Sequence, residues 1–516
     1  FYLQNEIPCD AYLINKLNDD KCNFENLKIQ KDLLSVCNMG FKYITAAEVF
    51  SDIPENKLPG PFPLPLLGNA LELFRYNLNL SEYVRAVQSK YGDMCEIHMA
   101  HNHKFLYRDS PNPGLKEIGL EQRGVIANRN LDEWKINRRF LERSVMSKRF
   151  LKEFTEKGNN IILDMFKLWD VLITKRQEID LAEWIPKFAG DAMLMTVTGQ
   201  PAYSMMNYFI SLGYEYNHDH IPVLKWKQSS RLISAVLSIF SITPCEYFAN
   251  TLEFRERRAY IDSLPEDAQI PSDALSLLIT ANTQRDPSRT LFKSLDRSLN
   301  DQEIGGILVD IFLGSFETTA TAICLTIYYV CKYPSVKSKL LSEISSIFGS
   351  LVTPPEKILY ENIEKLQYCD AIINEVLRLH PIIPVMPRSN SEPVEIGGYI
   401  WKDGHSFFGN FQGIQSNERD WVDAKIFDPD RFLRNNDSIR SKNAEIANNK
   451  GAFVPFGGGA KSCPGRLWAV VEVKVFLVAL LTRYDIEFVN KNQELELFWK
   501  TSFHWRNLKV YLKPKV

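Results

Sequence analysis

Phe456-Gly-Gly-Gly-Ala-Lys-Ser-Cys463-Pro-Gly465 is the stretch that decides the fold of this 516-residue chain. Its three consecutive glycines let the backbone adopt positive φ angles and let a flat ligand approach closely. Pro464 suits the first position of a helix, and apolar residues at helical spacing over residues 467–484 predict that helix. A sulfur at a helix N-terminus meets unpaired N–H groups and the positive end of the dipole. We therefore expect Cys463 to favour the thiolate form.

A single buried cysteine usually has no role beyond packing. Packing does not explain, however, why Cys463 follows a glycine turn whose ordering costs conformational entropy. The segment resembles the haem-binding signature F-x-x-G-x-x-x-C-x-G of the cytochrome P-450 family. Phe456, Gly459, Cys463 and Gly465 stand at its fixed positions, and Lys461 stands at its basic position. The resemblance implies haem b with Cys463 as the axial iron ligand, and O2 as co-substrate.

Two further stretches match a structural network of the same family. Glu375 and Arg378 lie three residues apart on a predicted helix that Pro381 ends, so they share one face and can pair. Taken alone, they would be an ordinary surface ion pair of well under ~1 kcal/mol. Arg431 matches the arginine of a P-E-R-F-like stretch, with Asp430 in place of the usual glutamate. The resemblance implies that these three residues form a buried network beneath the haem loop.

The longest apolar stretch covers residues 304–331, with Asn300 as a candidate N-cap and Pro334 just past its end. Its length also permits a membrane span. Asp310 and Glu317 would make that span costly, so we expect a central helix buried in the protein.

The centre of this helix resembles the oxygen-activating pattern [A/G]-G-x-[D/E]-T-T. Gly314, Glu317, Thr318 and Thr319 match the pattern, and Ser315 replaces its usual second glycine. A hydroxyl beside a carboxylate can relay protons to bound dioxygen, so Glu317 and Thr318 are the candidate catalytic residues. The alternative for Thr318 is a hydroxyl bonded back to a helical carbonyl.

Haem propionates need cationic or hydrogen-bonding partners. Trp134 and Arg138 stand four residues apart on one helix face, an arrangement that the family uses for propionate contact. Arg388 matches the family's second propionate arginine, and a guanidinium suits carboxylates through its fork geometry.

Composition agrees with one large domain. Because the matched motifs must converge on one cofactor, we expect a single haem domain over residues 58–516, preceded by a segment 1–57 of unknown role. Apolar residues make up 45% of the chain, and the net charge of −2 gives no sign of nucleic-acid binding. Nine cysteines without C-x-x-C spacing argue for a reducing compartment.

The proline-rich stretch from Leu58 to Pro65 resembles the hinge that follows the anchor helix in membrane-attached members. No apolar run of ~20 residues precedes it, and the chain starts at Phe1. We therefore expect a fragment or an imperfect gene model of a microsomal, fungal-like member. The stretch 94–133 also looks short for the elements that this region usually contains.

The resemblance implies a mainly α fold, a helical prism with a small β-rich side. Strands are expected at residues 394–399, with a turn at Gly397-Gly398, and at residues 503–512. Haem is expected between residues 314–319 and the Cys463 loop.

The resemblance implies a haem-thiolate monooxygenase that inserts one atom of O2 into an apolar substrate similar to a lipid, sterol or terpenoid. Electrons would come from an NADPH-dependent cytochrome reductase, with cytochrome b5 as a further donor, at the cytosolic face of the endoplasmic reticulum membrane. The cations Arg138, Arg139, Lys461 and Arg466 would steer that partner. The alternatives are a thiolate-haem isomerase or dehydratase that needs no reductase, and a non-catalytic haem-binding protein.

Overall fold

The computed structural model describes residues 60–61, 72, 75–76, 79–91, 123–126, 128, 130–215, 252–286, 297–349, 357–390, 392–396, 398–403, 405–433, 451–499, 503–505 and 507–515. The segment 1–57 and most of the stretch 94–133 lie outside the described residues.

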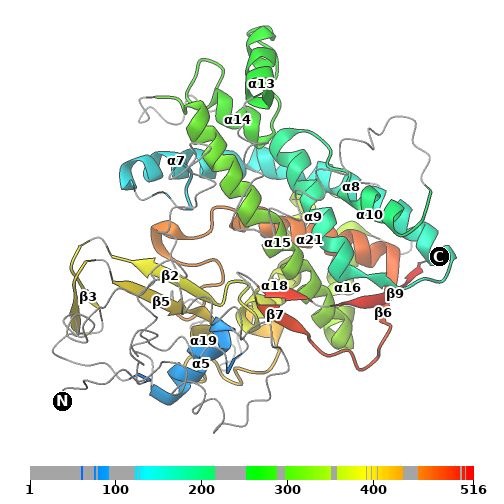
Figure 1. Ribbon diagram of the computed structural model, residues 1–516. Coiled ribbons are helices and arrows are strands. Elements are labelled where there is room, and N and C mark those ends of the chain that lie inside the picture. Colours follow the sequence, from blue (N-terminus) through cyan, green and yellow to red (C-terminus); the bar gives the residue numbers. More distant parts are fainter. Residues whose placement is uncertain are drawn as a thin grey trace, which may run out of the picture.

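Helices dominate the structure, as predicted, and they surround one long central helix (Figure 1). In chain order they are α5 (Leu80–Tyr91), α7 (Leu131–Val145), α8 (Lys148–Thr174), α9 (Leu181–Thr198), α10 (Ser204–Ser211), α13 (Leu252–Ser263), α14 (Ala274–Thr280), α15 (Asp301–Lys332), α16 (Pro334–Phe348), α17 (Tyr360–Ile363), α18 (Gln367–Leu379), α19 (Phe411–Gln415) and α21 (Arg466–Arg483). Two 3-10 turns, η1 (Pro429–Phe432) and η2 (Gly459–Lys461), lie in the loops before α21.

The strands form small antiparallel sheets. They are β1 (Ile179–Asp180), β2 (Val385–Ser389), β3 (Val394–Ile396), β4 (Tyr399–Trp401), β5 (Ser406–Asn410), β6 (Tyr484–Phe488), β7 (Leu497–Trp499), β8 (Phe503–Trp505) and β9 (Lys509–Pro514). Strand β9 pairs with β1 and β6, while β2 pairs with β5, β3 with β4, and β7 with β8. The predicted small β content is therefore present, with β2, β3 and β5 at the left of the view and β6 and β9 at the right (Figure 1).

The structure refines two strand predictions. The predicted turn within residues 394–399 is present, because Gly398 at φ 81° turns the chain between β3 and β4. Residues 503–512 likewise divide between β8 and β9, which belong to different sheets.

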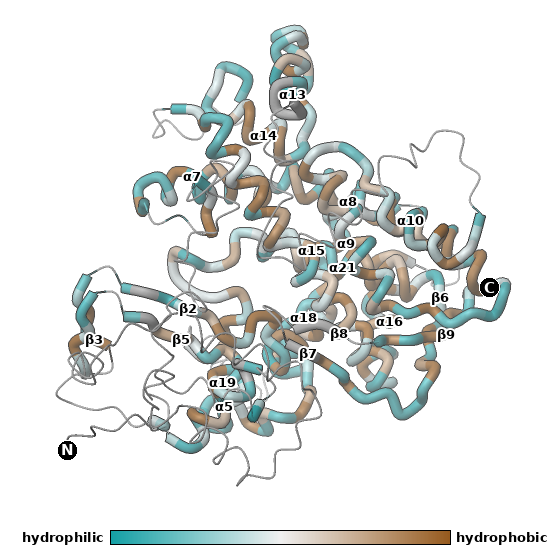
Figure 2. Tube along the Cα trace, viewed as in Figure 1, coloured by the Kyte–Doolittle hydropathy of each residue, from teal (hydrophilic) through white to brown (hydrophobic). Residues whose placement is uncertain are grey.

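The central helix α15 agrees closely with the predicted range. Asn300 accepts the backbone N–H of Glu303, and the Glu303 carboxylate accepts the N–H of Asn300, so the helix begins in a capping box. Tyr333 follows its last residue, and the next helix starts at Pro334. Helix α15 packs against α9, α18 and α21, and hydrophobic residues gather where these helices meet (Figure 2). By length and composition α15 could also cross a membrane, but 67% of its most apolar window is buried within the protein.

Candidate active site

The cysteine loop is shaped by its glycines. Gly457 and Gly459 adopt φ angles of 73° and 64°, a region that side chains strongly disfavour. The Cys463 N–H donates to the Phe456 carbonyl at 2.8 Å, which closes the loop, and the Cys463 side chain is exposed. Helix α21 begins at Arg466, so Pro464 lies in the preceding turn and not at the first helical position, as the sequence had suggested.

The protein alone does not lower the pKa of the Cys463 thiol. Desolvation raises this pKa, and the Gly465 N–H and the charges of Arg138 and Arg466 oppose the shift without reversing it. The helix N-terminus does act on the sulfur through the Gly465 N–H, as expected, but desolvation outweighs it, so the thiolate is not favoured by the protein alone. Coordination to a metal ion does deprotonate a thiol, so the loop suits a metal ligand better than a free thiolate.

Trp134, on α7, lies beside the cysteine loop. The Lys461 ammonium is 4.3 Å from the centre of the Trp134 ring, a cation–π contact. The indole N–H of Trp134 donates to the Val125 carbonyl at 3.0 Å, and the side chain is buried. The donor that the sequence assigned to a propionate is therefore bonded to the backbone in this structure.

Arg138 joins α7 directly to the cysteine loop. Its Nη2 donates to the Ser462 carbonyl at 2.5 Å, and its Nε donates to Glu142 at 2.7 Å. Only 8% of Arg138 is exposed, so it cannot belong to a surface that steers a partner, as the sequence had suggested. Of the four predicted steering cations, Arg139 and Arg466 are the exposed ones.

Arg388 lies on β2, opposite Phe407 of β5. Its side chain is partly buried, and desolvation lowers the pKa of its guanidinium. Nη1 donates to the Pro387 carbonyl at 2.8 Å, and no carboxylate pairs with Arg388 among the described residues. A desolvated cation without an anion is the chemical partner that a haem propionate needs.

The centre of α15 carries the second predicted part of the site. Gly314 is exposed, although most of α15 is buried, and a Cβ added to it would meet no atom within 4 Å. The Thr318 hydroxyl donates to the Gly314 carbonyl at 2.8 Å, which is the alternative contact expected for it. Glu317 is partly buried beside it. The Ser315 hydroxyl oxygen is buried and has no hydrogen-bond partner among the described residues.

The Glu375 carboxylate pairs with two arginines in the protein interior. Arg378 donates from Nε and Nη2 at 2.6 and 2.8 Å, and Arg431 donates from Nε at 3.0 Å. Arg378 also donates to the carbonyls of Gln415 and Ala424. Each of the three charged side chains is at most 2% exposed.

These residues fit an iron porphyrin. Gly314 on α15 and Gly458 and Gly459 on the loop leave open space where a Cβ would stand, which suits a flat ligand. The loop offers the sulfur of Cys463, a soft ligand for iron. Arg388 offers a cation that has no carboxylate partner among the described residues.

A comparison with protein families gives the same result, because the Cytochrome P450 family model matches residues 58–514. The chain belongs to the cytochrome P450 family. It is thus a haem-thiolate monooxygenase, an oxidoreductase that uses a haem iron and O2, and members of the family generally work with a redox partner on apolar substrates.

Relatives of this cytochrome P450 come from plants and mammals. It is 24% identical to a 3-beta-hydroxylase of Tanacetum parthenium, over 86% of this chain and 88% of the relative. It is 22% identical to tabersonine 16-hydroxylase 1 of Catharanthus roseus, over 83% and 85% of the two chains. It is 23% identical to cytochrome P450 2D28 of Mesocricetus auratus, over 83% and 86%. The likeness to fungal members stays a prediction.

Sequence reasoning missed some residues that build the site of this cytochrome P450. Asp310, which we used only to argue against a membrane span, accepts hydrogen bonds from residues 125 and 126. Gln415 accepts the Val454 N–H at 2.8 Å and so attaches the start of the cysteine loop to the network around Arg378. For Asp310 there was a signal in the sequence, since an acidic residue inside an apolar helix is unusual. No sequence pattern marked Gln415.

Proposed function

We propose that this cytochrome P450 inserts one atom of O2 into an apolar organic substrate, similar to a lipid, sterol or terpenoid, with electrons from an NADPH-dependent cytochrome reductase. The observation that carries the proposal is the Gly314–Thr318 segment, where a mainly buried helix opens beside a hydroxyl and a carboxylate. The names of two relatives, both hydroxylases, support this reaction class.

In this proposal Cys463 is the axial ligand of haem b, with Phe456, Lys461 and Gly465 in the loop that holds it. The bound haem supplies the reductive activation of O2. Arg388 and the Nη1 group of Arg138 take the propionates. Nη1 has no hydrogen-bond partner in the part of the chain that the structure describes, whereas Nε and Nη2 are bonded.

The proton relay is proposed to consist of Glu317 and Thr318. In the structure the Thr318 hydroxyl donates its proton to the Gly314 carbonyl. Rotation about χ1 would turn this proton toward the open space beside Gly314. The Glu317 carboxyl group would replace it with a proton taken from solvent. Phe312 and Phe316, whose ring centres lie 5.7 Å apart, are buried on the opposite face of the helix and anchor it there.

The redox partner is proposed to dock near the exposed cations Arg139 and Arg466, with cytochrome b5 as a further donor. We further propose attachment to the cytosolic face of the endoplasmic reticulum membrane. The proline-rich stretch 58–65 supports this location through its resemblance to a hinge.

The direct test supplies the haem-loaded protein with reductase and NADPH, or with a lipid hydroperoxide alone. A screen of sterols, fatty acids and terpenoids by substrate-induced difference spectra first selects the substrate. We expect a product that carries one atom of isotopically labelled O2 and requires NADPH. Rearrangement of the hydroperoxide without NADPH would instead indicate an isomerase or dehydratase, and haem loading without substrate-dependent NADPH consumption would indicate a binding protein.

A further inference from the structure

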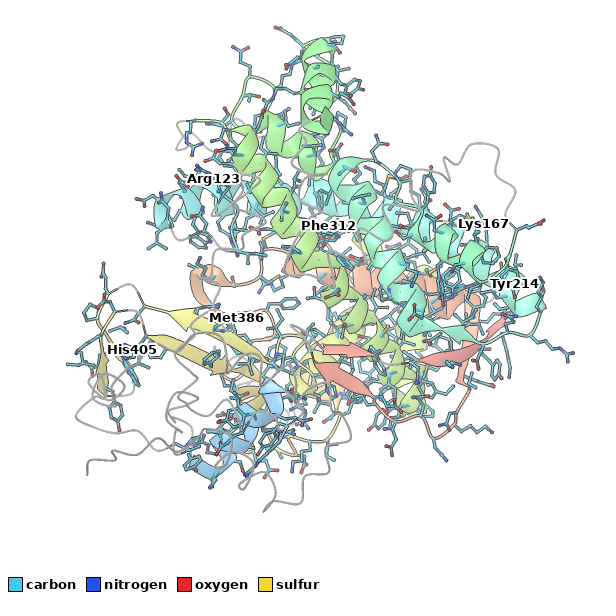
Figure 3. The ribbon with its side chains drawn as sticks, in the orientation of Figure 1. Arg123, Lys167, Tyr214, Phe312, Met386 and His405 are labelled. Carbon is cyan, nitrogen blue, oxygen red and sulfur yellow. The ribbon has the colours of Figure 1, made fainter. Side chains whose placement is uncertain are left out.

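Residues 123–126 cross the central helix α15 in unusually close contact. A Cβ added to Gly306 of α15 would lie 2.7 Å from the Gly124 nitrogen, and one added to Gly124 would lie 2.7 Å from the Gly306 carbonyl oxygen. Atoms that are not bonded do not approach so closely, so the crossing requires glycine in both segments, at positions 124 and 306. Figure 3 shows Arg123 beside the upper part of α15, with Phe312 farther along the same helix.

Asp310 holds this crossing in place from the next turn of α15. Its Oδ2 accepts the Val125 N–H at 2.5 Å and the Ile126 N–H at 2.8 Å. Two consecutive backbone amides are therefore fixed to one carboxylate on the helix that also carries Gly314 and Thr318.

The carbonyls of the same segment hold α7. The Val125 carbonyl accepts the Trp134 indole N–H at 3.0 Å. Asn137, fully buried on α7, donates from Nδ2 to the Arg123 carbonyl at 2.5 Å. Residue 138 is the next along the helix, and its guanidinium donates to the Ser462 carbonyl beside the cysteine. Direct contacts thus lead from Asp310 to the residue that precedes Cys463.

We propose that Asp310 is a positioning residue for the thiolate ligand. It anchors residues 123–126 to α15, these residues hold α7 through Trp134 and Asn137, and α7 holds the cysteine loop through Arg138. When the anchor is lost, α7 gains freedom to move, and the Ser462–Cys463 backbone loses its fixed support. The inference rests on the haem-thiolate site and is independent of the proposed substrate and redox partner.

The test compares D310A with D310N in the haem-loaded full chain, without substrate or NADPH. Haem transfer to apomyoglobin gives the rate of haem loss, and the reduced-CO spectrum gives the fraction of thiolate-ligated haem over time. We expect D310A to lose haem about tenfold faster, which corresponds to about 1.4 kcal/mol, and to convert to a non-thiolate spectrum. D310N should stay within about twofold of the unchanged protein, because its amide oxygen still accepts both N–H groups.

Thr326→Ala is the matched control. Thr326 is fully buried on the same helix, and its hydroxyl donates to the Ala322 carbonyl at 2.7 Å, away from residues 123–126. This control should lower the melting temperature without changing the rate of haem loss. G306A, which forces the two backbones apart, should reproduce the spectrum of D310A.

Two results would overturn the proposal. One is a D310A protein that melts earlier, as the control does, yet keeps its haem and its thiolate spectrum. The other is a D310N protein as impaired as D310A, because the charge and not the two hydrogen bonds would then be responsible. Because neither measurement involves turnover, they remain informative even if the proposed oxygen insertion is refuted.

Discussion

The Glu375 carboxylate accepts a hydrogen bond from Arg431 at 3.0 Å, although the two residues are 56 positions apart in the chain. The same oxygen also accepts the Asp428 N–H at 3.0 Å, so one atom fixes the η1 turn to α18. Arg431 in turn donates to the Val422 carbonyl at 2.6 Å. One buried carboxylate therefore organises the loops that precede the cysteine.

Glu375→Gln should destabilise the protein strongly. The substitution leaves Arg378 and Arg431 buried without a counter-charge, and removing one partner of a buried pair costs about 3–5 kcal/mol. We expect little folded, haem-loaded protein and a large fall in melting temperature, measured by circular dichroism and haem content. The matched control is Glu487→Gln, which breaks the exposed pair with Lys513 and should leave the melting temperature almost unchanged. Equal effects of the two substitutions would contradict a buried network.

Gly314→Leu should separate stability from substrate binding. A leucine favours the helix by up to about 1 kcal/mol over glycine, and its side chain enters open space, so the melting temperature should not fall. If this space belongs to the substrate, the substrate-induced spectral shift should disappear while haem content is kept. Gly190→Leu on α9, another helical glycine with no atom near its added Cβ, should leave the spectral shift unchanged. A normal shift in Gly314→Leu would place the substrate elsewhere.

The pH dependence of stability should change in Glu472→Gln. Burial raises the pKa of Glu472 from 4.5 to about 8, and its Oε1 has no hydrogen-bond partner among the described residues. Because the pKa of Glu472 is raised in the folded state, the protein is most stable, as far as this group is concerned, below pH 4.5, where the carboxyl is neutral in both states. This stability is lost as the pH rises towards 8. Because glutamine carries no charge, the variant and the original protein should have similar melting temperatures at pH 5. At pH 8 the variant should melt at a higher temperature, and its unfolding free energy should be larger by up to about 4 kcal/mol. An equal difference in melting temperature at both pH values would refute this origin.

Thr318→Val should reduce product formation far more than haem binding. The hydroxyl is the proposed proton donor, and a positioned general acid contributes about 10²–10⁴-fold to rate. We expect NADPH consumption to continue while the yield of oxygenated product per NADPH falls by about 10²-fold or more. Thr326→Val, with its hydroxyl on the same helix but bonded deep in the core, should keep the original yield. A similar yield from both variants would mean that the Thr318 hydroxyl serves only the structural hydrogen bond to the Gly314 carbonyl.

The sequence predicted the elements whose signals are local. Helix α15 combines a capping box at Asn300, a long apolar stretch and Pro334 after its end, so its boundaries could be placed within a few residues. The pairing of Glu375 with Arg378 follows from helical spacing alone. Arg431 could be added only through the family resemblance, because nothing local brings it to Glu375.

The errors arose where tertiary contacts decide. The direction of the Cys463 pKa shift was misjudged because desolvation of the thiol depends on tertiary contacts that the sequence does not show. Arg138 was assigned to the surface because the carbonyl that it contacts in the interior belongs to residue 462, which is far away in the sequence. The turn at Gly398 could be expected from its glycine pair, but the division of residues 503–512 between two sheets had no local signal.

The reduced-CO spectrum of Cys463→Ala tests the central claim most directly. The original protein, loaded with haem, should show the red-shifted Soret band of thiolate-ligated haem, and Cys463→Ala should lose it while its fold is kept. Cys369→Ala removes a fully buried thiol and should retain the band. A red-shifted band that persists in Cys463→Ala would contradict the assignment of Cys463 as the iron ligand.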